Sequence, residues 1–448
     1  MLQKLALASC MLWSATALSC GGGKTASNAS VTPPPSAHAE ATPALTSMPR
    51  TPEASPSVGS AVAAETLQVG APVPLPDNVA LIVEVGCWQC DGDYGKLVRI
   101  YRDASGVVQE TPLLAAPGGH TVSPDGSQVA FAWCSRGICD GFNPTSPDVQ
   151  STIAWSHDGG ITSTTFPPLD GIYDVAAVTR GMLLATGQTS DLRPLPIRHY
   201  PGGDTLASPP GGIYPIATGG DVIAFLTADR RAILLGPDVA PFDLGSGRQI
   251  NSIAPADVAG DRLAIDWSER VSDTDVRFYR SIVSLKGPRF HMEIERTYLV
   301  DGFFGQSGGW LDADTIIATY NFHDADLPAP AGSPDSRGSR PLPAVIDLKT
   351  STVHPIVEPF ASNQPYQHGR NFVLAVVRGP FARVVNTGSC LNLRAEPRAD
   401  APVRDCAADN VLLRWVGQEE KSTDGQNWAL VEMPDGDDGW VSPEFIAR

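Results

Sequence analysis

One pentapeptide has the spacing of a nucleophilic serine site. Residues 305–309 read Gly-Gln-Ser-Gly-Gly, which fits the Gly-x-Ser-x-Gly pattern of a serine held on a sharp turn between a strand and a helix. Ser307 would then be the nucleophile of an acyl-transfer reaction. The residues that follow, 310–320, read as a turn and a strand instead of a helix. The sequence therefore predicts that Ser307 is a loop serine, and it indicates no catalytic residue.

A second stretch could bind phosphate. Residues 19–25 read Ser-Cys-Gly-Gly-Gly-Lys-Thr, and a glycine-rich loop that ends in Lys-Thr is typical of nucleotide-binding sites. The first glycine of that motif would fall on Leu18, so the spacing is wrong. Residues 26–35 end in three prolines and cannot form the helix that should follow. We therefore expect no nucleotide and no other cofactor.

The carboxylates and histidines of the sequence do not form a recognisable metal-binding motif. The eight histidines are scattered, with no pair at ligand spacing. The segments 272–275 and 321–326 could hold calcium through carboxylates, but neither matches an EF-hand, and solvated turns are the favoured interpretation. Residues 435–439 read Asp-Gly-Asp-Asp-Gly and predict a hairpin turn. No metal ion is expected at these positions.

Residues 1–20 have the pattern of an export signal. Lys4 is the only charged side chain before an uncharged run over residues 5–19, which has the length of a signal-peptide core. The run ends in Ala17-Leu-Ser-Cys20, which resembles the bacterial lipobox. This resemblance implies a signal peptide over residues 1–19, acylation of Cys20, and a membrane-anchored protein of the bacterial cell envelope. Secretion without a lipid is the alternative.

Six further cysteines could form disulfides or bind a metal ion. They are Cys87, Cys90, Cys134, Cys139, Cys390 and Cys406. The first four lie in two segments that both end in Cys-Asp-Gly, and the last two bracket a short loop near the C-terminus. An even number in an exported chain favours three disulfides, with the pairing of the first four left open. A four-thiolate zinc site is the alternative, which an oxidising compartment disfavours.

Composition limits the partners and the fold. The 448 residues carry a net charge of −17, which argues against binding to nucleic acid. Residues 20–70 are rich in Ser, Thr, Ala and Pro, and they predict a disordered tether. The 43 glycines and 40 prolines, with short apolar segments between them, favour an all-β fold with many turns.

Residues 71–379 contain a repeated strand pattern. Seven apolar segments begin roughly 40 to 56 residues apart, a period expected of propeller blades, and each of the first six is followed by a partner strand. We expect these seven to be inner strands: Val79–Val85, Gln128–Trp133, Met182–Thr186, Val222–Leu226, Arg262–Trp267, Thr315–Tyr320 and Phe372–Val377. Because the seventh has no partner, the pattern favours six blades closed by a late strand, and seven blades are the alternative.

Two turns in this region are similar to known propeller turns. Residues 121–131, which contain Ser-Pro-Asp-Gly, resemble the hairpin of WD-like periplasmic β-propellers. Residues 156–162, Ser-His-Asp-Gly-Gly-Ile-Thr, resemble the Asp-box of sialidase-like propellers. In that family the box stabilises the fold away from the active site, and the arginine signature of sialidases is missing, so the resemblance implies no sialidase activity.

Residues 380–448 resemble a bacterial SH3-like (SH3b) domain. Leu391-Asn-Leu-Arg394 stands where that family has Leu-Asn-Val-Arg, residues 425–428 match its Gly-x-x-Trp hairpin, and residues 439–441 match its Gly-Trp-Val strand. The resemblance implies a small SH3-like β-barrel. Relatives bind cell-wall peptides in an aromatic groove, so the ligand-binding candidates are Trp415, Trp428 and Trp440.

These observations lead to two hypotheses about function. The first is a non-catalytic envelope lipoprotein that binds cell-wall material or envelope proteins through a propeller and an SH3-like module. The second is an envelope hydrolase acting on glycans or peptides, with the SH3-like domain as its targeting module. Convergent carboxylates or a Ser-His pair at the centre of the propeller would favour the enzyme. The sequence does not indicate which propeller face is functional.

Overall fold

The structure is a computed structural model that describes most of residues 64–448. The segments outside the description are 1–63, 88–95, 104, 115–118, 137–148, 180, 190–192, 208–210, 220–221, 236–238, 240, 255–259, 273–274, 287–290, 301–307, 324–338, 357–368 and 424. The described chain is almost entirely β-structure, with one short 3-10 helix, η3 (Pro443–Phe445). None of its helices is long and apolar enough to cross a membrane.

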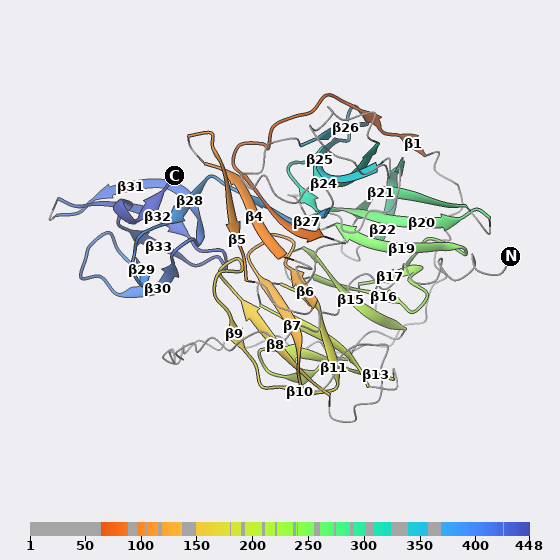
Figure 1. The fold of residues 1–448 in the computed structure, drawn as a ribbon, viewed down its shortest axis with the longest axis horizontal. Helices are drawn as coiled ribbons and strands as arrows, with labels where there is room; N and C mark the ends of the chain where they lie inside the picture. The colour runs from red at the N-terminus through yellow and green to blue at the C-terminus, as the bar shows by residue number, and fades with distance from the viewer. Residues whose placement is uncertain are drawn as a thin grey trace.

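Six sheets of four or five strands form a ring of blades (Figure 1). Blade 1 contains β27 (Gly369–Arg378), β3 (Val79–Cys87), β4 (Lys96–Arg102) and β5 (Val108–Pro112). Blade 2 contains β6 (Gly119–Val122), β7 (Val129–Arg136), β8 (Gln150–Ser156), β9 (Thr164–Thr165) and β10 (Leu169–Asp170). Blade 3 contains β11 (Ile172–Val178), β12 (Leu183–Gln188), β13 (Pro194–Tyr200) and β14 (Asp204–Thr205).

The other three blades continue the same antiparallel order. Blade 4 contains β15 (Gly212–Gly219), β16 (Val222–Thr227), β17 (Ala232–Leu234) and β18 (Phe242–Asp243). Blade 5 contains β19 (Arg248–Ala254), β20 (Arg262–Arg270), β21 (Val276–Lys286) and β22 (His291–Val300). Blade 6 contains β23 (Gly309–Trp310), β24 (Thr315–His323), β25 (Ser339–Asp347) and β26 (Thr352–Pro355). The expected six-bladed propeller is therefore confirmed.

Six of the seven strands that we expected to be innermost are instead the second strand of their blade, counted from the propeller axis. The strands that meet around the axis are β6, β11, β15, β19, β23 and β27, whereas β3, β7, β12, β16, β20 and β24 lie one place further out. The second strands are the most apolar because both of their faces are covered by neighbouring blades, as the buried run Val79–Val83 shows. Only Phe372–Val377, within β27, is an innermost strand, and it closes blade 1 by pairing with β3.

Part of the expected tether is ordered. β1 (Glu65–Thr66) pairs in parallel with β22, and β2 (Gln68–Val69) pairs in parallel with β26. Leu67 between them is only 5% exposed and packs into the core between blades 5 and 6. The tether prediction was wrong for residues 65–69, because composition alone does not show that a sheet edge is available to pair with them.

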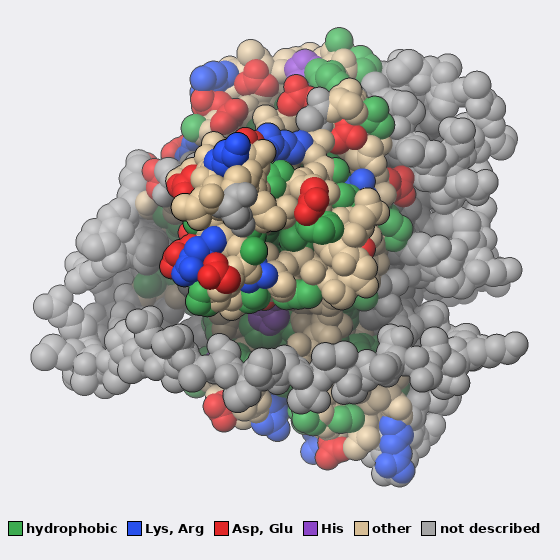
Figure 2. Space-filling model, turned by 90° about the vertical axis from the view of Figure 1, so that its left-hand side faces the viewer, with side chains coloured by type: hydrophobic (Ala, Val, Ile, Leu, Met, Phe, Trp, Pro, Cys, Tyr) green, Lys and Arg blue, Asp and Glu red, His purple; other side chains and the backbone are tan. Residues whose placement is uncertain are grey.

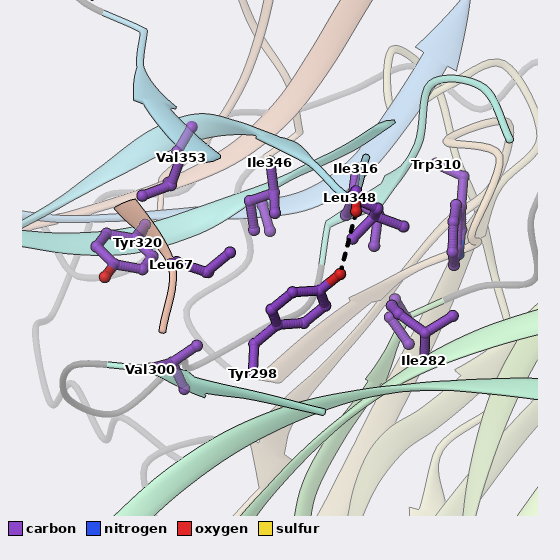
Figure 3. Packing of buried hydrophobic residues seen from close by; sticks show 14 of the residues in the cluster. Leu67, Ile282, Tyr298, Val300, Trp310, Ile316, Tyr320, Ile346, Leu348 and Val353 are labelled. Atoms are coloured by element: carbon purple, nitrogen blue, oxygen red, sulfur yellow. Dashed lines mark hydrogen bonds between the residues drawn. The ribbon is translucent and has the colours of Figure 1, made fainter. Parts of the chain in front are cut away.

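The packing between blades 5 and 6 illustrates how the ring is held together. Figure 3 shows Leu67, Ile282, Tyr298 and Trp310 packed into one apolar cluster. The Tyr298 hydroxyl donates a hydrogen bond to the carbonyl oxygen of Leu348 at 3.3 Å. Neighbouring blades therefore share a continuous core, and no blade buries its apolar faces alone.

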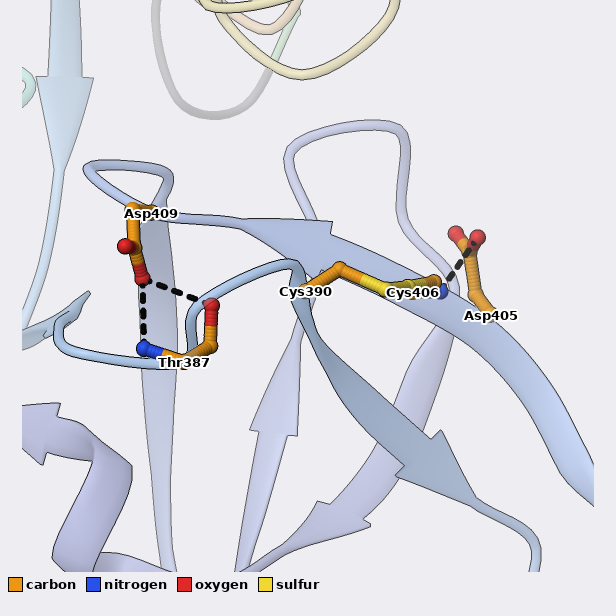
Figure 4. The surroundings of a disulfide bond; sticks show 5 residues. All are labelled: Thr387, Cys390, Asp405, Cys406 and Asp409. Atoms are coloured by element: carbon orange, nitrogen blue, oxygen red, sulfur yellow. Dashed lines mark hydrogen bonds between the residues drawn. A yellow bond between two sulfur atoms is a disulfide. The ribbon is translucent and has the colours of Figure 1, made fainter. Parts of the chain in front are cut away.

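Beyond the propeller, residues 381–447 form one seven-stranded antiparallel sheet. In sheet order its strands are β30 (Val403–Ala408), β29 (Cys390–Arg394), β33 (Asp438–Val441), β32 (Asn427–Glu432), β31 (Leu412–Lys421), β28 (Phe381–Val384) and β34 (Ile446–Ala447). The predicted disulfide joins Cys390 to Cys406 across β29 and β30, with a Cα–Cα distance of 5.6 Å (Figure 4). Beside it, Asp409 accepts hydrogen bonds from the backbone and hydroxyl of Thr387.

Candidate functional site

Several predicted site residues lie outside the description. They are Cys20, Cys90, Cys139 and Ser307, and of Cys87 only the backbone is described. Cys134 is disulfide-bonded to a partner outside the described side chains. β3 and β7 are equivalent strands of adjacent blades, so both end on the same face of the propeller. We call this face, at which the second strands end, the front face.

The three tryptophans differ in exposure. Trp428 is 4% exposed and Trp440 is 9% exposed, so both present little surface to a ligand. Trp415 is half-buried, and the guanidinium of Arg448 lies 3.6 Å above the centre of its ring. Neither Trp428 nor Trp440 belongs to the apolar cluster that contains Ala429, Val431 and Val441. Because successive side chains of a strand point to opposite faces, Trp428 and Trp440 lie on the other face of β32 and β33.

The C-terminal sheet is docked on blade 1. Only two residues connect β27 to β28, and the backbone of both is hydrogen-bonded, Gly379 to Asn78 and Pro380 to Trp415. The rings of Tyr101 and Phe381 pack edge to face with centroids 6.2 Å apart. Figure 1 shows the blue strands β28–β34 beside β5 at one side of the ring.

A buried arginine crosses this junction. Arg99 on β4 is 2% exposed, and its guanidinium donates a hydrogen bond to the carbonyl oxygen of Asn410 in the C-terminal sheet. The pKa of Arg99 is lowered to about 10, chiefly by burial and in smaller part by the positive charge of Arg383, whereas Tyr101 and Asp158 oppose this shift. A charged side chain in this position makes the docking specific, since its donors need defined acceptors.

The Asp-box turn forms the second part of the junction. The carboxylate of Asp158 accepts hydrogen bonds from the backbone of Ile161 and Thr162 at 2.9 Å and from the hydroxyl of Ser156 at 2.8 Å. The turn held in this way places Ile161 against the apolar cores of both the propeller and the C-terminal sheet. The Asp-box therefore acts here as a docking element, in addition to its expected role as a stable turn.

A groove of about 460 Å³ lies beside this junction. One wall is β5 and the two residues after it, the turn contributes Gly160 and Ile161, and the C-terminal sheet contributes Arg383 and Asn410. Its volume is within the range of about 300–1,000 Å³ that is typical of small-ligand sites. Both domains are needed to form the groove, which no motif in the sequence indicated.

A second cluster lies on the front face, where blades 1, 2 and 3 meet. The Nε2 atom of His120 on β6 is 3.6 Å from a carboxylate oxygen of Glu84 on β3. Asp174 on β11 lies on the other side, and burial raises its pKa to about 6, whereas the charge of His120 and a hydrogen bond from the backbone of Val175 oppose this shift. An imidazole between two carboxylates is a possible acid–base group.

Glycine is required beside this cluster. A methyl group at Gly119 would lie 1.9 Å from a carboxylate oxygen of Asp174, so any side chain there would displace the carboxylate. Close approach of the β6 backbone is thus what buries Asp174. The sequence missed the three residues of this cluster because they are far apart along the chain and belong to no motif.

Three carboxylates also gather in the C-terminal sheet. Asp405, Asp435 and Asp437 have oxygen atoms within 4.8 Å of one another. Burial, together with the negative charges of Asp437 and Asp405, raises the pKa of Asp435 to about 6, against a hydrogen bond from the backbone of Asp437. The hairpin predicted over residues 435–439 is present as the turn between β32 and β33.

Comparison with known proteins adds only distant likenesses. No protein family model matches the chain, and no curated protein matches it in sequence. A "putative 6-phosphogluconolactonase" from Bacteroides uniformis aligns with a TM-score of 0.31 and 10% identity, covering 80% of this chain and 90% of that one. Its counterpart from Bacteroides fragilis gives 0.29 and 12%, covering 79% and 88%. The WD40 repeats of RRP9 give 0.28 and 11%, covering 56% and 92%. At these scores the likenesses carry no argument about function.

Proposed function

We propose that this chain is a lipid-anchored, non-catalytic binding protein of the bacterial cell envelope, and that its C-terminal sheet is an SH3-like (SH3b) module. Its partners are cell-wall material or envelope proteins. The observation that supports this best is the docked junction, where two domains build one groove through the buried Arg99 and the Asp-box turn. Two domains that are already docked lose less conformational entropy when a partner binds than two flexibly linked modules would.

Co-sedimentation of the full chain with purified cell-wall fragments and with envelope protein fractions tests this function. We expect binding that falls at least tenfold when Asp158→Ala removes the Asp-box hydrogen bonds, because the groove then loses one wall. Asp204→Asn, which changes an exposed residue of blade 3, is the matched control and should bind normally. Absence of binding to every fraction would contradict the proposal.

Membrane attachment through Cys20 is part of the same proposal and has its own test. Cys20→Ser should release the protein from membranes, and intact mass should show acyl groups on the wild type only. Cys10→Ser is the control, because that cysteine precedes the proposed cleavage point. A mutant that stays membrane-bound, together with an unacylated wild type, would remove the anchor from the proposal.

A hydrolase is the second candidate, and the cluster on the front face favours it. His120 would take a proton from an attacking water molecule while Glu84 holds the imidazole, which is ordinary general-base catalysis. Hydrolysis of cell-wall fragments or esters that His120→Ala reduces by a factor of about 10²–10⁴ would support this candidate. His199→Ala, on β13, is the control, and equal activity of both variants would reject it.

A further inference from the structure

We propose that the groove at the domain junction binds the carboxylate of a small ligand or chain end, with Arg383 as its anchor. This inference rests on the proposed binding function and names the chemistry that the groove recognises. It differs from an aromatic binding groove, since the described lining contains one arginine, one glutamate, two amides, a hydroxyl and aliphatic side chains, and no aromatic ring.

Two arginines, Arg99 and Arg383, come together at this junction, in a chain that carries a net charge of −17. Arg383 is close enough to Arg99 for its positive charge to contribute to the lowered pKa of Arg99, after the larger effect of burial. Asp158 is near Arg99, but its carboxylate already accepts the hydrogen bonds of the Asp-box turn. An anion beside Arg383 would therefore relieve repulsion between two guanidinium groups.

Arg383 is held in place with donor capacity remaining. Its Nη1 atom donates to the side-chain oxygen of Asn410 at 3.2 Å, and its guanidinium also hydrogen-bonds to Tyr101. The Nε atoms of Arg383 and of Arg99 are both buried, and neither has a hydrogen-bond partner among the described residues. A planar guanidinium positioned in this way suits a carboxylate, which accepts two parallel hydrogen bonds.

The rest of the groove limits what else the ligand contains. Glu110 also lines the groove, so its negative charge would repel a dianion such as phosphate more strongly than a single carboxylate. Leu113, Leu114 and Ile161 offer aliphatic contact. We infer a ligand that combines one carboxylate with a short aliphatic part, as at the carboxyl end of a peptide.

The charges on the remaining C-terminal surface do not offer an equivalent site. Figure 2 looks onto this side of the molecule and shows acidic and basic side chains intermingled. Arg398 is paired with Glu396 and Asp400, and Arg404 with Asp438, at distances of 2.6–3.1 Å. Exposed arginines with such partners are neutralised locally, unlike Arg383 in the groove.

Calorimetric titration of the full chain with N-acetyl-alanyl-alanine, its C-terminal amide and inorganic phosphate tests the inference. We expect the free acid to bind at least tenfold more tightly than the amide and more tightly than phosphate. Arg383→Gln should weaken binding of the acid at least tenfold, and Arg383→Lys should weaken it by less. Arg414→Gln, which removes an exposed charge from the same sheet, should have no effect.

Equal affinity for acid and amide, or equal losses in Arg383→Gln and Arg414→Gln, would overturn the inference. Tighter binding of phosphate than of the free acid would also overturn the inference, and would mean that the groove recognises a phosphate group. Thermal unfolding of each variant shows whether the sheet is still docked. If wall or protein partners bind wild type and Arg383→Gln alike, the proposed binding function stands and only the anchor is rejected.

Discussion

At the scale of single residues, an ion pair in blade 5 is the most deeply buried charge interaction among the described residues. Arg280 on β21 donates two hydrogen bonds to the carboxylate of Asp266 on β20, at 2.7 and 2.8 Å, and both side chains are at most 3% exposed. Ser252 on the innermost strand donates a third, at 2.9 Å. The pair thus connects three strands of one blade inside the propeller.

Arg280→Leu should destabilise the propeller by about 3–5 kcal/mol, because it leaves the Asp266 carboxylate buried without its counter-ion. The double variant Asp266→Leu with Arg280→Met should recover most of that loss. Urea denaturation gives the free energies of unfolding. Arg404→Ala, which breaks an exposed pair, is the control and should cost less than about 1 kcal/mol. Similar losses in all three proteins would show that burial of the pair does not matter.

The raised pKa of Asp174 predicts a pH-dependent stability. Burial raises this pKa to about 6, so the folded state holds the proton more tightly than the unfolded state between about pH 4 and pH 6. Stability attributable to this group therefore increases as the pH falls through 6, and the ionised form is unfavourable above it. Asp174→Asn should be more stable than wild type at pH 7.5, and the difference should shrink by pH 5.

Urea midpoints of the two proteins at pH 5, 6 and 7.5 measure this difference. The asparagine keeps an oxygen to accept the backbone hydrogen bond of Val175, so the comparison isolates the charge. Asp204→Asn removes an exposed carboxylate and should give a difference that does not depend on pH. A constant difference for Asp174→Asn as well would mean that its carboxyl is not perturbed.

At the scale of elements, the short strands β1 and β2 cover the outer edges of two blades. Each pairs through only two residues, so their main contribution is the side chain of Leu67 between them. An uncovered edge strand is also a site for aggregation. The segment therefore stabilises blades 5 and 6 more than its length suggests.

Leu67→Ala should lower the free energy of unfolding by about 2–5 kcal/mol, because the cavity would open inside the core between blades 5 and 6. Val69→Ala is a matched control two residues away, since Val69 is 40% exposed, and it should change stability by less than about 0.5 kcal/mol. Thermal or urea unfolding distinguishes the two. Equal effects would mean that residues 65–69 are not packed as described.

At the scale of the whole molecule, the junction joins two domains that could otherwise move independently. Leu412 of the C-terminal sheet packs with Ala80 and Tyr101 of blade 1, and Arg99 adds its hydrogen bond to Asn410. Since the connecting residues are also hydrogen-bonded on both sides, we expect the propeller and the sheet to unfold together. This coupling is what keeps the groove in one shape.

Scanning calorimetry should show one transition for the wild type and two for Arg99→Ala, with the C-terminal sheet unfolding first. The variant leaves the Asn410 carbonyl without its donor inside the junction, which removes part of the coupling. Arg102→Ala is the control on the same strand, because Arg102 contacts Leu75 and Asp77 within the propeller. A single transition in Arg99→Ala would show that docking does not depend on this residue.

What the sequence determined by itself is local and periodic. Turn residues and the spacing of apolar segments predicted an all-β fold and six blades closed by β27, and the bracketed loop predicted the bond between Cys390 and Cys406. These features follow from residues near one another in the chain, or from repetition of one unit. The Asp-box was recognisable for the same reason, since Asp158 bonds to residues three and four positions away.

The tertiary structure decided everything that depends on which strands become neighbours. The most apolar strands proved to be second strands because two neighbouring blades cover them, and Leu67 became a core residue because two blade edges were open to pairing. Arg99 and Asn410 are 311 positions apart, and Glu84, His120 and Asp174 come from three blades. Contacts of this kind leave no periodicity and no motif in the chain, so only the packed ring and its docked sheet reveal them.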